Sequence, residues 1–199
     1  MCANYTLSKF NILKQFKVKI NYNKVPKILE VLWNHPPPGW IKINSDEVAH
    51  SSHGHASGGA IFRNNSGDML DCFASYFDIP DSLYAKMLAA IMTIEISHYK
   101  GCSNIWLECD SSLVGDIFKG GAMIPWKLLC NCAHCRHLIR LMNFRISHIF
   151  REGNICVVKL ASFGVVSREY SSWNSIPEFL MAHFHRNKIS LPKFRFKNL

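Results

Sequence analysis

The stretch Trp40-Ile41-Lys42-Ile43-Asn44-Ser45-Asp46 decides the fold of this chain. Its apolar residues alternate with polar ones, which is the period-two pattern of a strand that buries one face. A second apolar run, Ile105-Trp106-Leu107-Glu108-Cys109-Asp110, also ends in an aspartate. Two carboxylates at the ends of separate strands supply the hard oxygen ligands, on rigid elements, that a divalent-metal site needs.

The sequence around this run predicts three strands in an antiparallel meander, followed by helices that alternate with strands. Such an order predicts an α/β fold with a mixed five-stranded sheet and helices on its faces. Ser82 is the expected N-cap of the longest helix, and the polar stretch 47–57 is expected to be a loop. The expected strands are 40–46, 58–63, 69–76, 105–110 and 144–149, and the expected helices are 82–99, 111–119, 126–141 and about 154–166.

The chain has 199 residues, of which 48% are hydrophobic, enough for one domain with a sizeable core. We expect a basic N-terminal arm at 1–32, the domain at 33–170 and a basic C-terminal tail at 171–199. The prolines of 35–39 predict a stiff entry into the first strand, because proline fixes φ and removes a hydrogen-bond donor.

The net charge of +9 resides in the two flanks. Residues 1–35 carry six lysines and one glutamate, and residues 183–199 carry five basic residues and no acid. Basic flanks suit a polyanion such as nucleic acid, because each phosphate contact releases counterions. Solvated tails that aid solubility are the alternative interpretation.

Eight cysteines without a secretory pattern predict free thiols in a reducing, intracellular compartment, with nucleus and cytoplasm both open. A transit peptide also remains open for the lysine-rich N-terminus. Cys132 and Cys135 have zinc-knuckle spacing, but all nearby ligand candidates lie in one expected helix, which favours core-facing thiols over zinc. The histidines at 50, 53 and 55 could bind a metal or lie in a polar loop. No apolar stretch reaches the roughly 20 residues of a membrane span.

Five segments of the chain, in order, carry a resemblance to a known family. They are Trp33–Asp46, Gly58–Arg63, Trp106–Ser111, Ser147–Asn154 and Leu191–Phe196. Together they resemble the plant ribonuclease H-like domain, ribonuclease H type 1, of the retrotransposon reverse-transcriptase kind. The resemblance covers about residues 33–196, and it implies the same fold as the element order.

The resemblance implies hydrolysis of the RNA strand of an RNA–DNA hybrid by two magnesium ions held by four carboxylates. The implied first and third ligands are Asp46 and Asp110. The family's second ligand, a glutamate on the long helix, corresponds here to Lys86, and its fourth, an aspartate, corresponds to Val158. Magnesium binding is therefore expected to be weak or absent, and Lys86 is expected either to be solvated or to fill the old metal position as a salt-bridge partner.

Other residues near these positions have two possible roles each. Asp46 could be a plain strand-end residue, and Asp110 could cap the helix that follows it. Glu47 replaces a family glycine; the alternation of side chains along a strand predicts that it faces away from Asp46, whereas a bend in the loop would let it help. Arg151 and Asn154 either shape the strand-to-helix turn or, with Lys86, contact nucleic acid; His148 is expected to be a sheet residue near the site.

Three functions follow from these observations. The first is an active magnesium-dependent ribonuclease, which needs substitutes for the two missing ligands. The second, which the charges favour, is a pseudoenzyme that binds RNA–DNA hybrid or another polyanion with hydrolysis lost or weak. The third is a decayed or repurposed domain that acts as a protein-interaction module. The sequence predicts that no membrane is a partner, and it leaves the oligomeric state open.

Overall fold

The computed structural model describes residues 15–16, 27–50, 54–79 and 81–197. The chain divides into two compact units. The larger runs from Val31 to Lys193, and the smaller combines residues 1–30 with 194–199. A two-stranded sheet of β1 (Lys27–Val31) and β8 (Lys193–Lys197) makes up most of what is described of the smaller unit. Most of the expected N-terminal arm therefore lies outside the described residues.

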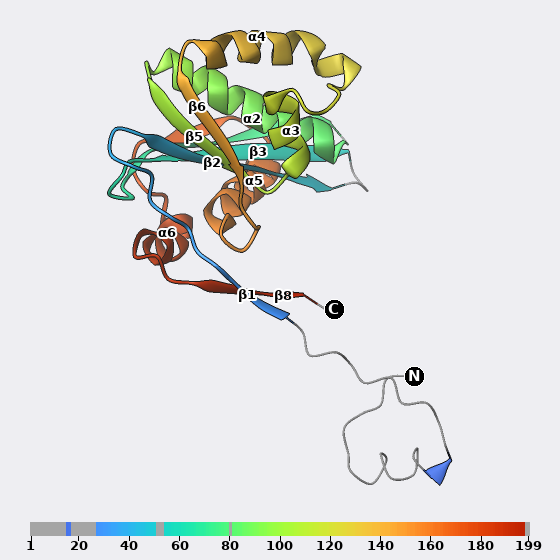
Figure 1. Ribbon diagram of the computed structural model, residues 1–199, viewed down its shortest axis with the longest axis vertical. Helices are drawn as coiled ribbons and strands as arrows, with labels where there is room; N and C mark the ends of the chain where they lie inside the picture. Colours follow the sequence, from blue (N-terminus) through green and yellow to red (C-terminus); the bar gives the residue numbers. More distant parts are fainter. Residues whose placement is uncertain (1–14, 17–26, 51–53, 80, 198–199) are drawn as a thin grey trace. The chain divides into compact units, whose positions relative to one another are not determined.

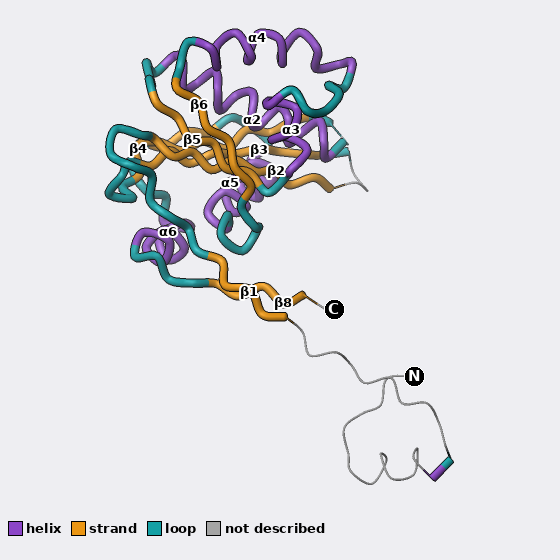
Figure 2. The backbone as a smooth tube through the Cα atoms, viewed as in Figure 1, coloured by secondary structure: helices purple, strands orange, loops and turns teal. Residues whose placement is uncertain are grey.

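The larger unit is built on a six-stranded mixed sheet (Figure 2). Its spatial order is β6-β5-β2-β3-β4-β7, with β2, β5 and β6 parallel to one another and β3, β4 and β7 joined in antiparallel pairs. The expected α/β fold with a mixed sheet is confirmed, and a short sixth strand extends it at one edge. The strands are β2 (Ile41–His50), β3 (His55–Arg63), β4 (Met69–Phe77), β5 (Asn104–Cys109), β6 (Asn143–His148) and β7 (Ser171–Trp173).

Helices cover both faces of this sheet, as Figure 1 shows. On one face lie α2 (Ser82–Tyr99), α3 (Ser112–Lys119), the 3-10 turn η1 (Trp126–Leu128) and α4 (Leu129–Arg140). They pack with the sheet around the largest core cluster, which includes Ile43, Met87 and Ile117. On the other face α5 (Ile155–Ser167) packs around a second cluster, which includes Ile61, Cys72 and Leu160.

Two glycines of β3 let these helices approach the sheet from both sides. A Cβ added to Gly58 would lie 2.6 Å from the Cβ of Ala89 on α2, and one added to Gly59 would lie 2.9 Å from the Cβ of Leu160 on α5. Both distances are shorter than carbon atoms tolerate. The pair Gly58-Gly59 therefore sets how closely α2 and α5 flank the centre of the sheet.

The expected loop at 47–57 is wrong. β2 continues to His50 and β3 starts at His55, so the two strands pair from Lys42–Arg63 out to His50–His55. The polar composition of this stretch hid the strands, because an antiparallel ribbon satisfies its backbone whatever its side chains are. His53 lies outside the described residues, and the His55 ring hydrogen-bonds the Tyr76 hydroxyl.

Two helix starts also differ from expectation. Asp81, rather than Ser82, caps α2, since its carboxylate accepts a hydrogen bond from the backbone N–H of Tyr84 at 3.0 Å. Ser111 caps α3 through the N–H of Val114, so Asp110 is not the cap. The long helix expected at 126–141 begins with the 3-10 turn and becomes α-helical at Leu129.

The boundary expected at residue 170 falls too early. Beyond it β7 pairs with β4, and a further helix, α6 (Met181–Lys188), follows the 3-10 turn η2 (Glu178–Leu180). Leu180 and Phe184 are buried in the same cluster as α5. The basic charge of this segment pointed to a tail, but its apolar side chains complete the core.

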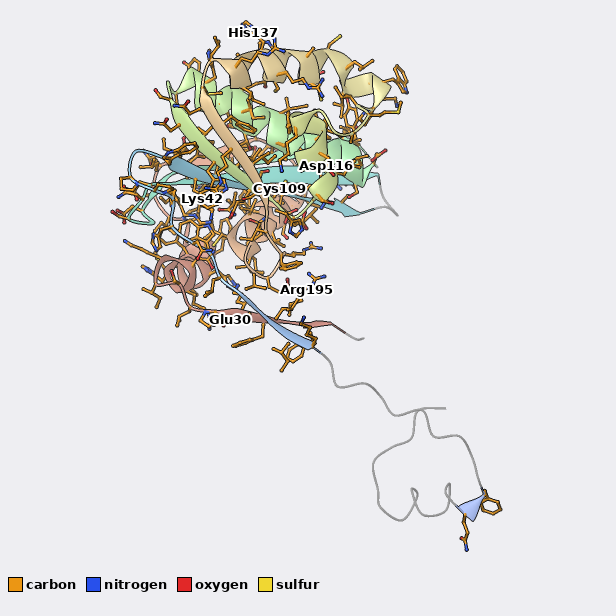
Figure 3. All side chains as sticks on the ribbon, viewed as in Figure 1. Glu30, Lys42, Cys109, Asp116, His137 and Arg195 are labelled. Atoms are coloured by element: carbon orange, nitrogen blue, oxygen red, sulfur yellow. The ribbon has the colours of Figure 1, made fainter. Side chains whose placement is uncertain are left out.

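Cys132 and Cys135 are buried in the main core, and Cys130 is exposed. Figure 3 shows His137 on the outer side of α4, where it is exposed. Among the described residues, no group of cysteines and histidines is close enough to hold a metal ion. In the same residues, no helix combines the length and apolar character needed to cross a bilayer.

Candidate active site

The parallel register of β2 and β5 brings the two predicted aspartates together. Ser45 of β2 pairs with Cys109 of β5. Asp46 follows Ser45 in the chain, and Asp110 follows Cys109. Figure 3 labels Cys109 at this end of β5, beside α3. Because the parallel pairing of β2 with β5 ends at Ser45–Cys109, the two carboxylates lie side by side just beyond it, although β2 itself continues to His50. The sequence predicted this pair from the strand ends alone.

Glu47 joins the pair, which the sequence analysis did not expect. Its Oε1 accepts a hydrogen bond from the Ser82 hydroxyl at 2.9 Å, on the α2 face of the sheet. Asp46 instead accepts a hydrogen bond from Asn154 at 3.3 Å, at the start of α5. The two side chains thus leave β2 on opposite faces, as alternation requires. Their carboxylates nevertheless converge with that of Asp110, with one oxygen of each lying within 4.8 Å of the others.

Lys86 lies among these three carboxylates. Its Nζ is 2.6 Å from Asp110 Oδ1, 3.1 Å from Glu47 Oε2 and 3.9 Å from Asp46 Oδ1. The contact with Asp110 is a hydrogen bond, whereas Glu47 Oε2 is held by charge alone and has no hydrogen-bond partner. We call Asp46, Glu47, Asp110 and Lys86 the lysine–carboxylate cluster.

The cluster holds more negative charge than burial favours. Asp46 is only 3% exposed. Burial, and then the charge of Asp110 and the contact with Glu47, raise the pKa of Asp46 to about 8. Burial and the neighbouring carboxylates thus favour the protonated form of Asp46, and Lys86 neutralises part of the remaining negative charge.

Lys86 stays protonated in this setting. Burial alone lowers the pKa of its ammonium, but the hydrogen bond to Asp110 and the charges of Glu47, Asp110 and Asp46 together raise the pKa above its usual value. Its side chain is 21% exposed, compared with 1% for Asp46 and 14% for Asp110. The ammonium is a permanent positive charge at the mouth of the cluster.

Asn154 supports the cluster from beneath. Its Nδ2 donates to the Ser45 carbonyl at 3.1 Å and to Asp46 Oδ2 at 3.3 Å. It is 1% exposed, and its Oδ1 has no hydrogen-bond partner. A direct contact with nucleic acid, which the sequence suggested, is excluded by this burial; Asn154 orients Asp46 and begins α5 instead.

The remaining predicted residues surround this site without joining it. Arg151 is exposed in the turn before α5. His148 ends β6, is exposed and packs its ring edge-to-face with Phe150 at 5.2 Å. Val158 lies half-buried in the first turn of α5 and offers no ligand atom.

Sequence reasoning missed two members of the site, Glu47 and Ser82. Glu47 was set aside because alternation fixes the face on which a side chain starts but not how far it reaches. Ser82 was assigned to helix capping, yet its hydroxyl serves Glu47. The usable signal was Glu47 itself, a charged residue directly after a strand-end aspartate.

Comparisons with known proteins place this geometry in a family. The model of the family described as reverse transcriptase-like matches residues 44–164. A protein from Arabidopsis thaliana that is described as a ribonuclease H protein is 25% identical over 149 residues. That match covers 73% of this chain but 24% of the relative, so the chain spans about a quarter of that protein's length.

Solved structures share the fold. A ribonuclease H1 from the archaeon Halobacterium salinarum matches with a TM-score of 0.58 and 20% identity, over 65% of this chain and 98% of that one. The LC11 ribonuclease H1, solved in complex with an RNA/DNA hybrid, matches with a TM-score of 0.59 and 21% identity, over 64% and 98%. Since the family match spans more than half of its length, the chain belongs to the reverse transcriptase-like family of ribonuclease H-like domains.

Proposed function

We propose that this domain binds nucleic acid of the RNA–DNA hybrid kind and that two-metal hydrolysis is lost or weak in it. The observation that carries the proposal is the position of Lys86 Nζ, within 4 Å of all three carboxylates of the lysine–carboxylate cluster. Binding would use backbone and 2′-OH contacts rather than base edges, so sequence preference should be low.

The residues of the cluster do not fit a pair of divalent ions. Two such ions carry +4, which four carboxylates balance. Here three carboxylates are present and Lys86 adds +1, so the fully ionised cluster reaches only −2. Mg²⁺ also needs oxygen ligands at about 2.0–2.1 Å in octahedral geometry, and the ammonium lies 2.6 Å from Asp110 Oδ1, where such an ion would compete with it. The magnesium that the family resemblance implies therefore has no suitable pair of sites.

Two further observations support nucleic acid as the partner. The LC11 relative of similar fold was solved with an RNA/DNA hybrid, and a foamy viral protease-reverse transcriptase, with a TM-score of 0.50, was solved with dsDNA. In this chain, residues 183–199 carry five basic side chains and no acid. Such an excess of positive charge favours a polyanion over a neutral ligand.

The decisive experiment pairs binding with cleavage. The full chain is titrated into a labelled RNA–DNA hybrid at several salt concentrations, and cleavage is followed in Mg²⁺ or Mn²⁺. We expect salt-sensitive binding without cleavage. Cleavage by the unaltered chain would show that the site still accepts its metals. An absence of binding even at low salt would leave the protein-interaction module as the remaining function.

Restoring the family's ligands gives a second, independent measurement. Lys86→Glu with Val158→Asp adds two carboxylates in place of an ammonium and an isopropyl group, so the family's four ligand positions are all acidic, with Glu47 as a fifth carboxylate beside them. We expect this double variant to gain metal-dependent cleavage of the hybrid over the unaltered chain. The matched control adds Asp46→Asn to the double variant, which should abolish the gain. If the double variant folds and binds hybrid but gains no cleavage, the loss of these two ligands does not explain the lost activity.

A further inference from the structure

A pocket of about 270 Å³ opens between the end of α3 and the last turns of α4, on the same face of the sheet as α2. Its charged side chains are all positive: one lysine and two arginines, with no carboxylate among them. Its floor is apolar. The lining residues are Phe118, Lys119, Gly120, Arg136, Ile139 and Arg140. A concave surface with three cations and no anion is typical of a site for a negatively charged group.

One of the three cations has a structural partner, and two do not. Arg136 is half-buried, and its Nη2 donates to the Ile117 carbonyl at 2.8 Å, which fixes its guanidinium in the wall of the pocket. Lys119 and Arg140 are exposed. In the part of the chain that the structure describes, neither is in salt-bridge range of a carboxylate. Two positive charges therefore face solvent at the rim.

The ends of the two helices do not account for this charge. Lys119 and Arg140 lie in the last turns of α3 and α4, where cations are favoured by the helix dipole. Each helix end, however, carries the equivalent of only about half a negative charge. Two helix ends offset about one of the three cations, so the pocket stays positive by about two charges.

We propose that this pocket binds a backbone phosphate of the nucleic acid that the domain is proposed to bind. The inference rests on the proposed function and names a second anchoring point for the same ligand. α3 begins two residues after Asp110 and has eight residues, so the pocket lies about 12 Å along the helix from that end of β5. A polyanion with a phosphate on every nucleotide can occupy both places at once.

The chemistry of the pocket selects a phosphate rather than a base. Its charged groups are all hydrogen-bond donors; guanine alone offers a major-groove edge made only of acceptors, and that edge is neutral, whereas a phosphate also answers the net positive charge of the pocket. Phe118 is 9% exposed, so it forms part of the floor and offers little surface on which a base could stack. Arginine and lysine donors around an apolar floor match the oxygen atoms of a phosphodiester.

The first test measures hybrid binding by the full chain carrying Lys119→Gln and Arg140→Gln together. Each phosphate contact contributes a slope of about −0.9 to the dependence of log affinity on log salt. The double variant should bind more weakly at low salt, with a slope shallower by about 1 to 2. The ratio of the unaltered chain's affinity to the variant's affinity should therefore fall about three- to fourfold per lost contact between 50 and 200 mM salt. Lys119→Arg with Arg140→Lys, which keeps both charges, should retain the slope.

The matched control is Lys159→Gln, an exposed cation of α5 on the opposite face of the sheet. It should leave the slope within error of the unaltered chain. If Lys159→Gln lowers the slope as much per charge as the pocket variant, binding senses only net charge and the proposal is overturned. It is equally overturned if the pocket variant binds with unchanged slope and affinity.

The second test separates this inference from the proposed function. Inorganic phosphate is titrated into the full chain while the backbone amides of Gly120 and Gly121, which follow α3, are observed by NMR. Saturable shifts that vanish in the Lys119→Gln, Arg140→Gln variant support the pocket as an anion site. Such shifts together with no hybrid binding would refute the proposed function but not the anion site. An absence of shifts, together with hybrid binding that the variant does not weaken, would refute the pocket alone.

Discussion

Two lysines meet carboxylates on the same pair of strands, but their surroundings differ. Lys42 of β2 pairs with Glu108 of β5 at 2.9 Å, donates to the Asn34 carbonyl at 2.8 Å and is 1% exposed. Its ammonium lies over the Trp106 ring at 4.0 Å. Lys86 reaches the lysine–carboxylate cluster from α2 and remains 21% exposed.

The first pair belongs to a closed network. Glu108 also accepts hydrogen bonds from Asn44 at 3.3 Å and Ser147 at 3.1 Å, and Asn44 in turn accepts from Trp33 and Arg63. One carboxylate, with both oxygens hydrogen-bonded, thus meets one ammonium, and the Arg63 guanidinium adds a second buried cation to the network. This network anchors the segment before β2 onto the sheet, as a buried ion pair requires if it is not to destabilise the fold.

The second lysine meets three carboxylates, and the charges do not balance. Glu47 Oε2 lacks a hydrogen bond, and the pKa of Asp46 is raised to about 8. Such an excess of negative charge next to solvent is typical of a ligand site rather than of a structural contact. The two regions therefore differ in that a single carboxylate with both oxygens hydrogen-bonded meets Lys42, whereas three carboxylates, one of them with an unpaired oxygen, share Lys86.

The largest effect is expected for Lys42→Met, which leaves Glu108 buried without a countercharge. We expect the free energy of unfolding to fall by about 3–5 kcal/mol, measured by denaturant unfolding at pH 7. Adding Glu108→Gln removes the stranded charge and should recover part of the loss. A fall of less than about 1 kcal/mol would mean that this pair is no more constrained than a surface salt bridge.

Lys86→Met should destabilise less, by about 1.5–3 kcal/mol, which is the range for hydrogen bonds to charged groups. Because it leaves three carboxylates without a cation, Mg²⁺ or Mn²⁺ should raise the melting temperature of this variant by mass action. The same ions should not raise the melting temperature of Lys42→Met. An equal response of both variants to the ions would contradict the difference between the two regions.

Asp46→Asn should remove a pH dependence. A carboxyl whose folded pKa is raised from 3.8 to about 8 holds its proton in the native state while the unfolded state has lost it. Native stability is therefore highest at low pH and falls as pH rises toward 8, by up to about 2 kcal/mol between pH 6 and 8 for one group. The difference in unfolding free energy between variant and unaltered chain should grow in favour of the asparagine over that range. A difference that stays constant with pH would show that Asp46 titrates normally.

The smallest effect is expected for Ser82→Ala, which removes the 2.9 Å hydrogen bond to Glu47 and should cost about 1 kcal/mol. Because Ser82 and Lys86 both contact Glu47, their substitutions should not be additive. Ser82→Ala combined with Lys42→Met should be additive to within about 0.5 kcal/mol, since the two share no partner. Coupling between Ser82 and Lys42 would instead join the two regions into one network.

The sequence predicted the main sheet and the pair Asp46–Asp110 well, for a definite reason. Alternating apolar residues mark the strands, and the order of strands and helices leaves few topologies. It failed at 47–57, where β2 and β3 continue through polar residues, and after residue 170, where charge concealed the core residues Leu180 and Phe184. Local composition does not show which backbone finds a partner strand or which apolar side chain finds a core.

By itself, the sequence determined the α/β fold and the pair Asp46–Asp110, because these depend on local pattern; that Lys86 and Val158 stand where the family has acidic ligands is what the resemblance implies. Only the tertiary structure decided that Glu47 joins the aspartates, that Asn154 is buried beneath Asp46 and that the Lys86 ammonium lies among three carboxylates. Those facts depend on how far side chains reach from opposite faces of a sheet. They also depend on distances between elements that are remote in the chain, and packing alone sets those distances.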